Sequence, residues 1–295
     1  MKNLLTLLFI LSLSSSFAQT STEIYLFDMK VENGKISLSN GINITKHKGY
    51  DNQPFFHPSQ PLIYYSSFDD SSRSDIKYYN YTTRQTNNLT VTREREYSPS
   101  VTPDTNFISC IIQRDNGAQD LAKYPINGGK PKVLINHLKI GYHAWASPDK
   151  LLLFVLDDSA HNSLHYYYLD KDADTVIAEN IGRSLHKIPG QNAMSFVQKI
   201  SDNLSVIKKF DMATGRVSNI IYTLPGQDQL AWLQNNIILM SDGNKLYFYQ
   251  ENGHEEFKDK QWKPVMIIGN TSMLKGITRL AVNVDNSKLA VVVSE

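Results

Sequence analysis

Short apolar runs separated by turn residues recur along the chain. The three clearest runs follow a proline-containing turn and occupy positions 62–65, 107–112 and 151–155. Apolar runs of this length, bounded by Pro, Ser and Asp, are typical of buried strands, because proline fixes φ and cannot donate to a central β-ladder. The helical spacing of apolar positions is absent. The pattern therefore predicts strands joined by tight turns.

The turns recur at a nearly constant interval. In the three clear copies the turn proline stands at positions 58, 103 and 148, so both intervals are 45 residues. Less regular copies have their turns at Gly190, Asn235 and Asp285, which gives further intervals of 42, 45 and 50 residues. Each of these turns also leads into an apolar run. The sequence therefore contains six structural repeats.

A second hairpin lies between successive turns. It is visible at 76–80, which turns through 82–84, and again at 207–211, which turns through 213–215. Two hairpins in each repeat give four strands in about 45 residues, which is the size of one blade of a β-propeller. We therefore predict an all-β fold, a six-bladed β-propeller with four antiparallel strands per blade.

The two ends of the chain complement each other. The sixth repeat contains only two strands before the last residue, whereas segments 23–28 and 35–38 form a hairpin ahead of the first repeat. We predict that these N-terminal strands complete the last blade and close the ring. A closed ring leaves no free edge between the first and last blades, which is how repeat folds avoid edge-to-edge association. We expect a monomer.

The repeated turn resembles a known motif. The segments 54–59 (PFFHPS) and 144–150 (AWASPDK) are similar to the repeat of TolB-type propellers, whose consensus is Pro-x-Trp-Ser-Pro-Asp-Gly followed by an apolar strand. The resemblance covers roughly residues 20–295. It implies a six-bladed propeller of the kind found in the periplasmic TolB protein, and in the substrate-gating propellers of tricorn and prolyl-oligopeptidase-like peptidases.

The first eighteen residues have the features of a secretory signal peptide. Lys2 precedes an apolar stretch at 4–13, and Ser16-Phe17-Ala18 matches a cleavage site before Gln19. The apolar stretch is too short to span a bilayer as a helix. No cysteine stands at the end of this signal segment, so we expect no lipid anchor. We predict a signal peptide at 1–18, a single propeller domain at 19–295, and a periplasmic or secreted protein without membrane insertion.

Composition narrows the choice of partners. Thirty Lys and Arg residues nearly balance twenty-nine Asp and Glu residues, so the charge pattern of a nucleic-acid-binding protein is absent. The single cysteine, Cys110, lies within an apolar run and is expected to be a buried small hydrophobic residue. We expect a protein or a cell-envelope component as the partner.

Residues near the inner strands are the first candidates for a site. His57, His143 and His186 stand close to the start of the inner strand in three repeats, and Glu96 stands there in a fourth. Inner strands line the channel of a propeller, so these side chains, with Tyr142, are candidates for ligand binding. A ring of histidines could also bind a metal or act in acid–base catalysis. We favour histidines packed in the channel wall, and predict no metal and no cofactor.

Paired carboxylates form a second group of candidates. Asp69 and Asp70 follow the second strand of the first repeat, and Asp157 and Asp158 follow that of the third. Such pairs could contact a sugar or a cation, although solvated loop acids are the simpler interpretation. We expect all four to lie in loops on one face.

The sequence favours binding over catalysis. It contains no nucleophile elbow, zinc-binding helix motif, phosphate-binding glycine loop or dinucleotide fingerprint. Our preferred hypothesis is a non-catalytic exported propeller that binds a protein or envelope component. The alternative is a carbohydrate-active hydrolase or lyase whose catalytic residues would include His57, Glu96 and His143. A propeller that serves a separate peptidase subunit is a third possibility.

Overall fold

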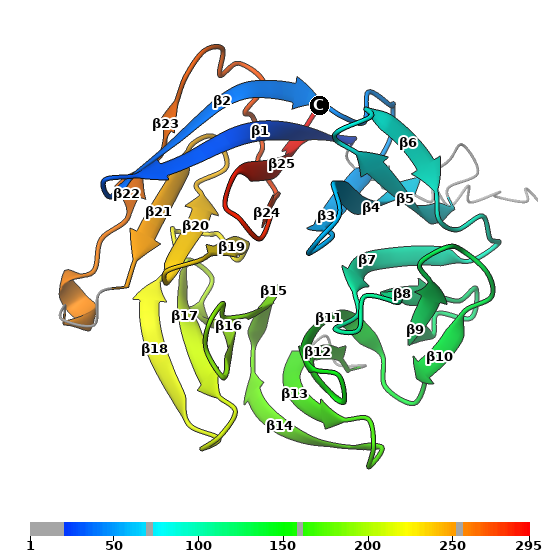
Figure 1. Cartoon of the computed structure of the whole chain (residues 1–295). Coiled ribbons are helices and arrows are strands. Elements are labelled where there is room, and N and C mark those ends of the chain that lie inside the picture. The colour runs from blue at the N-terminus through cyan, green and yellow to red at the C-terminus, as the bar shows by residue number, and fades with distance from the viewer. Residues whose placement is uncertain (1–20, 69–72, 158–161, 252–255) are drawn as a thin grey trace, which may run out of the picture.

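The protein is a ring of six β-sheets around a central axis (Figure 1). The computed structural model describes residues 21–68, 73–157, 162–251 and 256–295. The predicted signal peptide at 1–18 lies outside the described residues. We number the blades in chain order, starting with the sheet that contains residue 51. The predicted all-β, six-bladed fold is confirmed.

Four strands form each of the first five blades, ordered from the axis outwards. Blade 1 contains β3 (Asp51–Phe56), β4 (Leu62–Phe68), β5 (Ser74–Asn80) and β6 (Gln85–Asn88). Blade 2 contains β7 (Arg95–Val101), β8 (Phe107–Gln113), β9 (Gln119–Pro125) and β10 (Lys132–Ile135). Blade 3 contains β11 (Ile140–Ser147), β12 (Lys150–Leu156), β13 (Asn162–Tyr168) and β14 (Ala173–Glu179). Blades 4 and 5 contain β15 (Ile181–Lys187), β16 (Ala193–Ser201), β17 (Leu204–Asp211) and β18 (Val217–Tyr222); and β19 (Leu230–Leu233), β20 (Ile237–Ser241), β21 (Leu246–Gln250) and β22 (Lys263–Pro264).

The sixth blade is built from both ends of the chain, as predicted. Its order from the axis is β24 (Arg279–Val282), β25 (Lys288–Ser294), β1 (Thr22–Glu32), β2 (Lys35–Asn43) and β23 (Met266–Ile267). Strands β1 and β25 are antiparallel, with Ile24 opposite Val292 and Tyr25 opposite Val291. The fifth strand, β23, was not predicted; it is two residues long and pairs in parallel with β2. One short 3₁₀ helix (Phe257–Asp259) precedes β22.

The repeated turn motif is explained by hydrogen bonds within the turn. The Asp104 carboxylate accepts a hydrogen bond from the Thr102 hydroxyl at 2.6 Å, and Asp149 accepts one from Ser147 at the same distance. Asp285 likewise accepts from both the backbone N–H and the hydroxyl of Ser287. These hydrogen bonds from side chains stabilise a tight turn in which the backbone groups have few partners of their own. The Ser/Thr-Pro-Asp pattern therefore recurs in blades 2 and 3 because its aspartate stabilises the turn between the first two strands.

The hydrophobic core is divided among the six interfaces between neighbouring blades. One cluster of buried side chains lies at each interface among the described residues. Cys110 is fully buried in the cluster between blades 1 and 2, as expected. Tryptophans also join blades directly: Trp145 Nε1 donates to Ser109 Oγ at 2.8 Å, and Trp232 Nε1 donates to Ser195 Oγ at 2.7 Å. Each blade is therefore held by both of its neighbours.

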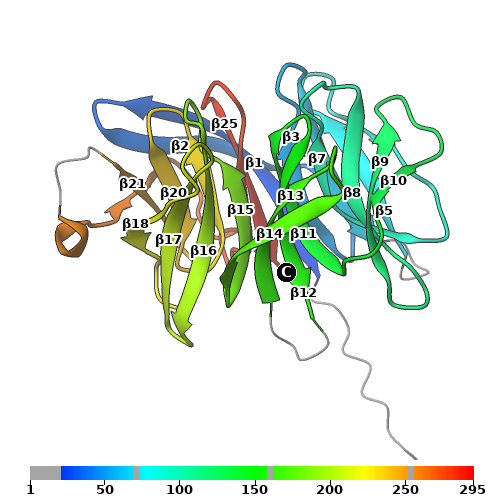
Figure 2. The same cartoon turned by 90° about the horizontal axis from the view of Figure 1, so that it is seen from below.

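The two faces of the ring carry different loops. The turns between first and second strands, which contain Pro58 and Pro148, lie on one face, whereas the inner strands begin at the other face (Figure 2). We call the first the turn face and the second the entry face. Among the described residues, no helix has the length and apolar character of a membrane span.

Ring closure can be tested with two isoleucines on adjacent strands. Ile24 in β1 is fully buried between blades 6 and 1, whereas Ile42 in β2 is 41% exposed. Replacing Ile24 by Ala leaves a cavity in the closing interface and should lower the free energy of unfolding by about 2–5 kcal/mol. Ile42→Ala should cost less than about 1 kcal/mol. Urea unfolding measures both, and equal losses would contradict the role of β1 in closure.

Candidate functional site

All six inner strands line a central channel of about 770 Å³. Its walls are largely apolar, and they include Phe55, Trp145, Leu185 and Val282. Its polar lining includes the predicted residues Tyr142, His143 and His186, and three cations that the sequence analysis did not select: Arg183, Lys187 and Arg279. None of the described residues that line the channel is an aspartate or a glutamate.

A hydrogen bond crosses the channel where the inner strands begin. Arg279, at the start of β24 in blade 6, donates to the Tyr142 hydroxyl at 3.0 Å, and Tyr142 belongs to the opposite blade 3. The guanidinium carbon also lies 5.1 Å from the centre of the Tyr142 ring. A second N–H group of Arg279 donates to Gln229 Oε1 at 3.0 Å. These contacts place a charged group across the axis at the entry-face end of the channel.

A second arginine lies beside this bridge. Arg183, in β15 of blade 4, forms an ion pair with Asp228 through Nε at 3.5 Å, and its backbone N–H donates to the same oxygen at 3.3 Å. Burial alone would raise the pKa of Asp228, but the Arg183 guanidinium and backbone N–H lower it below the ordinary value. The Asp228 carboxylate is therefore ionised at neutral pH, and it neutralises the positive charge of Arg183.

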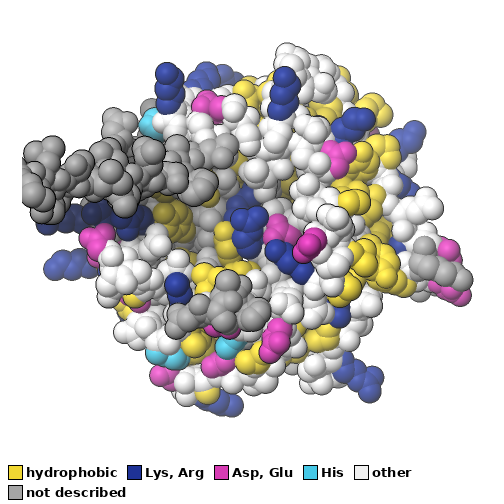
Figure 3. Space-filling model, turned by 180° about the vertical axis from the view of Figure 1, so that it is seen from behind, with side chains coloured by type: hydrophobic (Ala, Val, Ile, Leu, Met, Phe, Trp, Pro, Cys, Tyr) yellow, Lys and Arg dark blue, Asp and Glu magenta, His cyan; other side chains and the backbone are white. Residues whose placement is uncertain are grey.

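Every blade places a polar residue at or just beyond this end of the channel. The six are Tyr50, Tyr97, Tyr142, Arg183, Asp228 and Arg279. Burial raises the pKa of Tyr50 to about 12, although the nearby Arg279 and Arg183 oppose the increase. The entry face accordingly shows Lys or Arg side chains and acidic side chains together at its centre (Figure 3). We call these six residues, together with Gln229, the channel ring.

The two channel histidines are neutral at physiological pH. Burial lowers the pKa of both His143 and His186 to about 4. His143 Nε2 lies 2.8 Å from Ser109 Oγ, whose own proton is donated to the Ser100 carbonyl. Ser109 must therefore accept from His143, which places the imidazole proton on Nε2. His186 Nε2 lies 2.8 Å from Ser184 Oγ in the same strand.

His57 has a different environment. It directly follows β3, and its Nδ1 accepts hydrogen bonds from the backbone N–H groups of Ser59 and Gln60 at 3.1 and 3.0 Å. Burial lowers the pKa of His57, which keeps Nδ1 available as an acceptor. The residue lines a smaller hollow between blades 1 and 6, with Tyr81 and Asn283, and not the channel. Its described contacts are those of a turn-forming residue.

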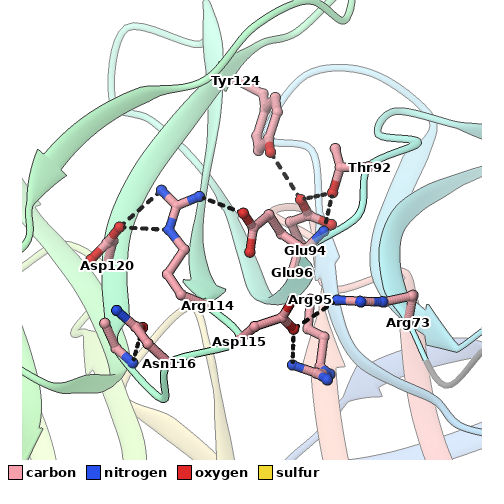
Figure 4. Close-up of polar contacts among 11 residues, drawn as sticks. Arg73, Thr92, Glu94, Arg95, Glu96, Arg114, Asp115, Asn116, Asp120 and Tyr124 are labelled. Atoms are coloured by element: carbon pink, nitrogen blue, oxygen red, sulfur yellow. Dashed lines mark hydrogen bonds and ion pairs between the residues drawn. The ribbon is translucent and has the colours of Figure 1, made fainter.

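Glu96 also lies away from the channel. Its side chain is completely buried, and it accepts hydrogen bonds from the Thr92 hydroxyl at 2.6 Å and the Tyr124 hydroxyl at 2.9 Å (Figure 4). Burial raises the pKa of Glu96 to about 7, although these two hydrogen bonds oppose the increase. The structure therefore does not bring His57, Glu96 and His143 together in one site.

Several ion pairs lie near the buried Glu96 carboxyl group. Arg114 contacts Glu94 at 3.0 Å and Asp120 at 2.9 Å, while Asp115 contacts Arg73 at 3.1 Å and Arg95 at 3.5 Å (Figure 4). Solvent screens the two pairs of the exposed Asp115, so each contributes little stability, whereas Asp120 is buried. The ion pairs connect the segments that precede β5 and β7 with the segment that follows β8.

The predicted acidic loops are only partly described. Asp69, Asp70 and Asp158 lie outside the described residues. Asp157 is exposed and directly follows β12. Asp157 is therefore the only one of the four predicted carboxylates within the described residues.

The channel ring could have been found from the repeats. Its six blade residues stand six to eight positions before the turn positions used to align the repeats. An alignment of all six units would have placed Arg183, Asp228 and Arg279 within one position of Tyr142, the only ring member selected. The sequence analysis instead selected histidines, which occupy no common position.

The buried Glu96 carboxyl predicts a pH-dependent stability. Its folded-state pKa is raised to about 7, so the folded state retains a proton that the unfolded chain releases near its ordinary pKa of 4.5. Stability relative to Glu96→Gln should be highest below pH 4.5 and should fall by about 3 kcal/mol as the pH rises to 7.5. Urea unfolding of both proteins from pH 4.5 to 8 measures the difference. A difference that does not change with pH would contradict the assignment.

Comparisons with known proteins identify the fold. No protein-family model and no curated protein matches the sequence. Among solved structures, a TolB candidate from Agrobacterium tumefaciens aligns with a TM-score of 0.69 at 10% identity, over 94% of this chain and 99% of that one. TolB from Acinetobacter baumannii aligns with a TM-score of 0.60 at 11% identity, over 94% and 64% of the two chains. A protein of unknown function from Bacteroides thetaiotaomicron aligns with a TM-score of 0.56 at 11% identity, over 93% and 76%. The chain therefore has the fold of TolB-type six-bladed propellers.

Proposed function

We propose that this protein is an exported, non-catalytic propeller that binds a protein or another component of the cell envelope through its channel and the loops around it. The channel carries the proposal. A concave site of a few hundred Å³ with mainly apolar walls and a few converging polar groups is the usual form of a binding site. Here all six blades contribute to such a site, and its volume is about 770 Å³.

The channel residues suit recognition. Within the channel ring, Arg279 is held by hydrogen bonds to Tyr142 and Gln229, and Arg183 is held by Asp228. Both channel histidines have pKa values near 4 and so carry no charge at neutral pH. Rigid polar groups on a scaffold provide specificity at a low entropic cost. No observation favours the alternative of a carbohydrate-active enzyme, because its three candidate residues have separate environments.

The proposal places the protein outside the cytoplasm. It combines the signal peptide expected at 1–18 with the periplasmic or secreted location expected for the mature chain. The TolB-type fold is compatible with a periplasmic location. We expect a monomer without a lipid anchor.

Export is tested by the mass of the protein after expression in bacterial cells. The periplasmic or secreted form should begin at Gln19, because the signal peptidase cleaves after small residues such as Ala18. A variant that lacks residues 2–18 should remain in the cytoplasm. Recovery of the full-length protein in the cytoplasm only, with no shortened form, would contradict the proposed export.

Partner binding is tested with two valines that are equally exposed. Val284 lines the turn-face end of the channel, whereas Val176 lies on outer strand β14; each is 54% exposed. The mature protein is used as bait for envelope extracts and culture supernatant. We expect a specific partner whose recovery falls at least about tenfold with Val284→Glu and not with Val176→Glu, because a charge at a binding surface disrupts apolar contacts. Equal recovery with both variants would contradict binding at the channel.

A further inference from the structure

We propose that the channel is a blind binding pocket for an organic carboxylate with an apolar body, which enters from the turn face and places its carboxylate against Arg279 and Arg183. This inference rests on the proposed binding function and specifies the chemistry of the ligand. It follows from the shape of the channel, from the charge of its lining and from the chemistry of its walls.

A hydrogen bond crosses the channel at one end. The Arg279–Tyr142 hydrogen bond joins opposite blades where the inner strands begin, and Gln229 extends this bridge toward blade 5. Channel-ring members Tyr50 and Tyr97 do not line the channel. The lining instead continues to the turn face, where it includes the turn prolines at 58, 103 and 148. A ligand would therefore enter between these turns and meet the bridge as the floor of the pocket.

The floor and wall of this pocket are cationic. Arg183, Lys187 and Arg279 line it, and none of the described lining residues is acidic. Asp228, which lies behind the lining, forms an ion pair with Arg183. The described hydrogen-bond partners of Arg279 are the neutral Gln229 and Tyr142, so neither of them neutralises its positive charge. The net charge of these groups is positive, and it favours an anion.

The donors at the floor match a carboxylate. A guanidinium carries five N–H groups in a planar arrangement that suits two carboxylate oxygens. The two described hydrogen bonds of Arg279 use two of these groups. The Tyr142 hydroxyl accepts from Arg279, so its own proton can be donated to an anion. On the wall, Lys187 Nζ donates to the Ala146 carbonyl at 2.6 Å and carries two further protons.

The walls between the floor and the turn face are apolar. They are formed by Phe55, Trp145, Leu185, Val282 and the turn prolines. Trp145 is oriented by its hydrogen bond to Ser109, so its ring is a fixed surface. Apolar walls above a cationic floor fit a ligand with one negative end and an apolar or aromatic body. A highly charged ligand such as free phosphate would leave these walls without contacts.

The test compares two probes that differ only in charge. N-acetyl-phenylalanine carries a carboxylate, and N-acetyl-phenylalanine amide is its neutral counterpart. Isothermal titration calorimetry with the mature protein should show at least about tenfold tighter binding of the acid. The affinity for the acid should fall as the ionic strength rises, because salt screens the attraction. Equal binding of acid and amide, or no binding of either, would overturn the proposal without the use of any variant.

Two substitutions locate the site. Arg279→Gln should weaken binding of the acid at least about tenfold and leave the amide unchanged. Arg216→Gln removes the same charge from an exposed position immediately before the outer strand of blade 4 and should have no effect. Arg279→Lys keeps the charge and should retain part of the affinity, provided that circular dichroism shows both Arg279 variants folded. Wild-type affinity in a folded Arg279→Gln variant would overturn the proposal.

Peptide probes identify the source of the carboxylate. A pentapeptide that ends in phenylalanine with a free carboxyl group is compared with N-acetyl-phenylalanine. Tighter binding of the pentapeptide assigns the site to the carboxyl end of a peptide chain, and equal binding assigns it to a small organic acid. A partner recovered by the mature protein, together with no preference for acid over amide, would overturn this inference and leave the proposed function intact.

Discussion

The pairing of β1 with β25 is the interaction on which the rest of the structure depends. It joins strands from opposite ends of the chain, with seven residue pairs from Thr22–Ser294 to Asp28–Lys288. An ion pair between Asp28 and Lys288 lies at one end of this ladder. Without β1 and β2, the sixth blade would keep only two of its long strands, and blades 1 and 5 would each expose one face of their buried clusters. The ring is therefore closed by contacts that are the most distant in sequence.

Closure also sets the geometry of the channel. Arg279 lies in β24, which pairs only with β25 among the described strands, and β25 is fixed by β1. The hydrogen bond from Arg279 to Tyr142 in the opposite blade exists because both inner strands are held at fixed distances from the axis. The same constraint makes the channel a binding site of defined shape. Arg279 and Lys187, whose described hydrogen-bond partners are neutral groups, are available to a ligand and not consumed by the fold.

The fold could be predicted from the sequence because its cause is local and repeated. The turn prolines at 58, 103 and 148 and the acids such as Asp149 mark hairpins by their own backbone chemistry. The site was less predictable because it depends on side-chain direction. Glu96 stands seven positions before its turn proline and is buried between blades, whereas His143 stands five positions before its own and lines the channel. The short strand β23 was also missed, since two residues at an edge leave no periodic pattern.

Hydrogen exchange measured by mass spectrometry tests ring closure most directly. If the termini close the ring, the amides of β1 and β25 exchange only through global unfolding, at the same rate as those of central strands such as β8 and β12. The account is contradicted if β1 exchanges rapidly while the strands of blades 2 and 3 remain protected, because the N-terminal strand would then be dispensable for the closed ring.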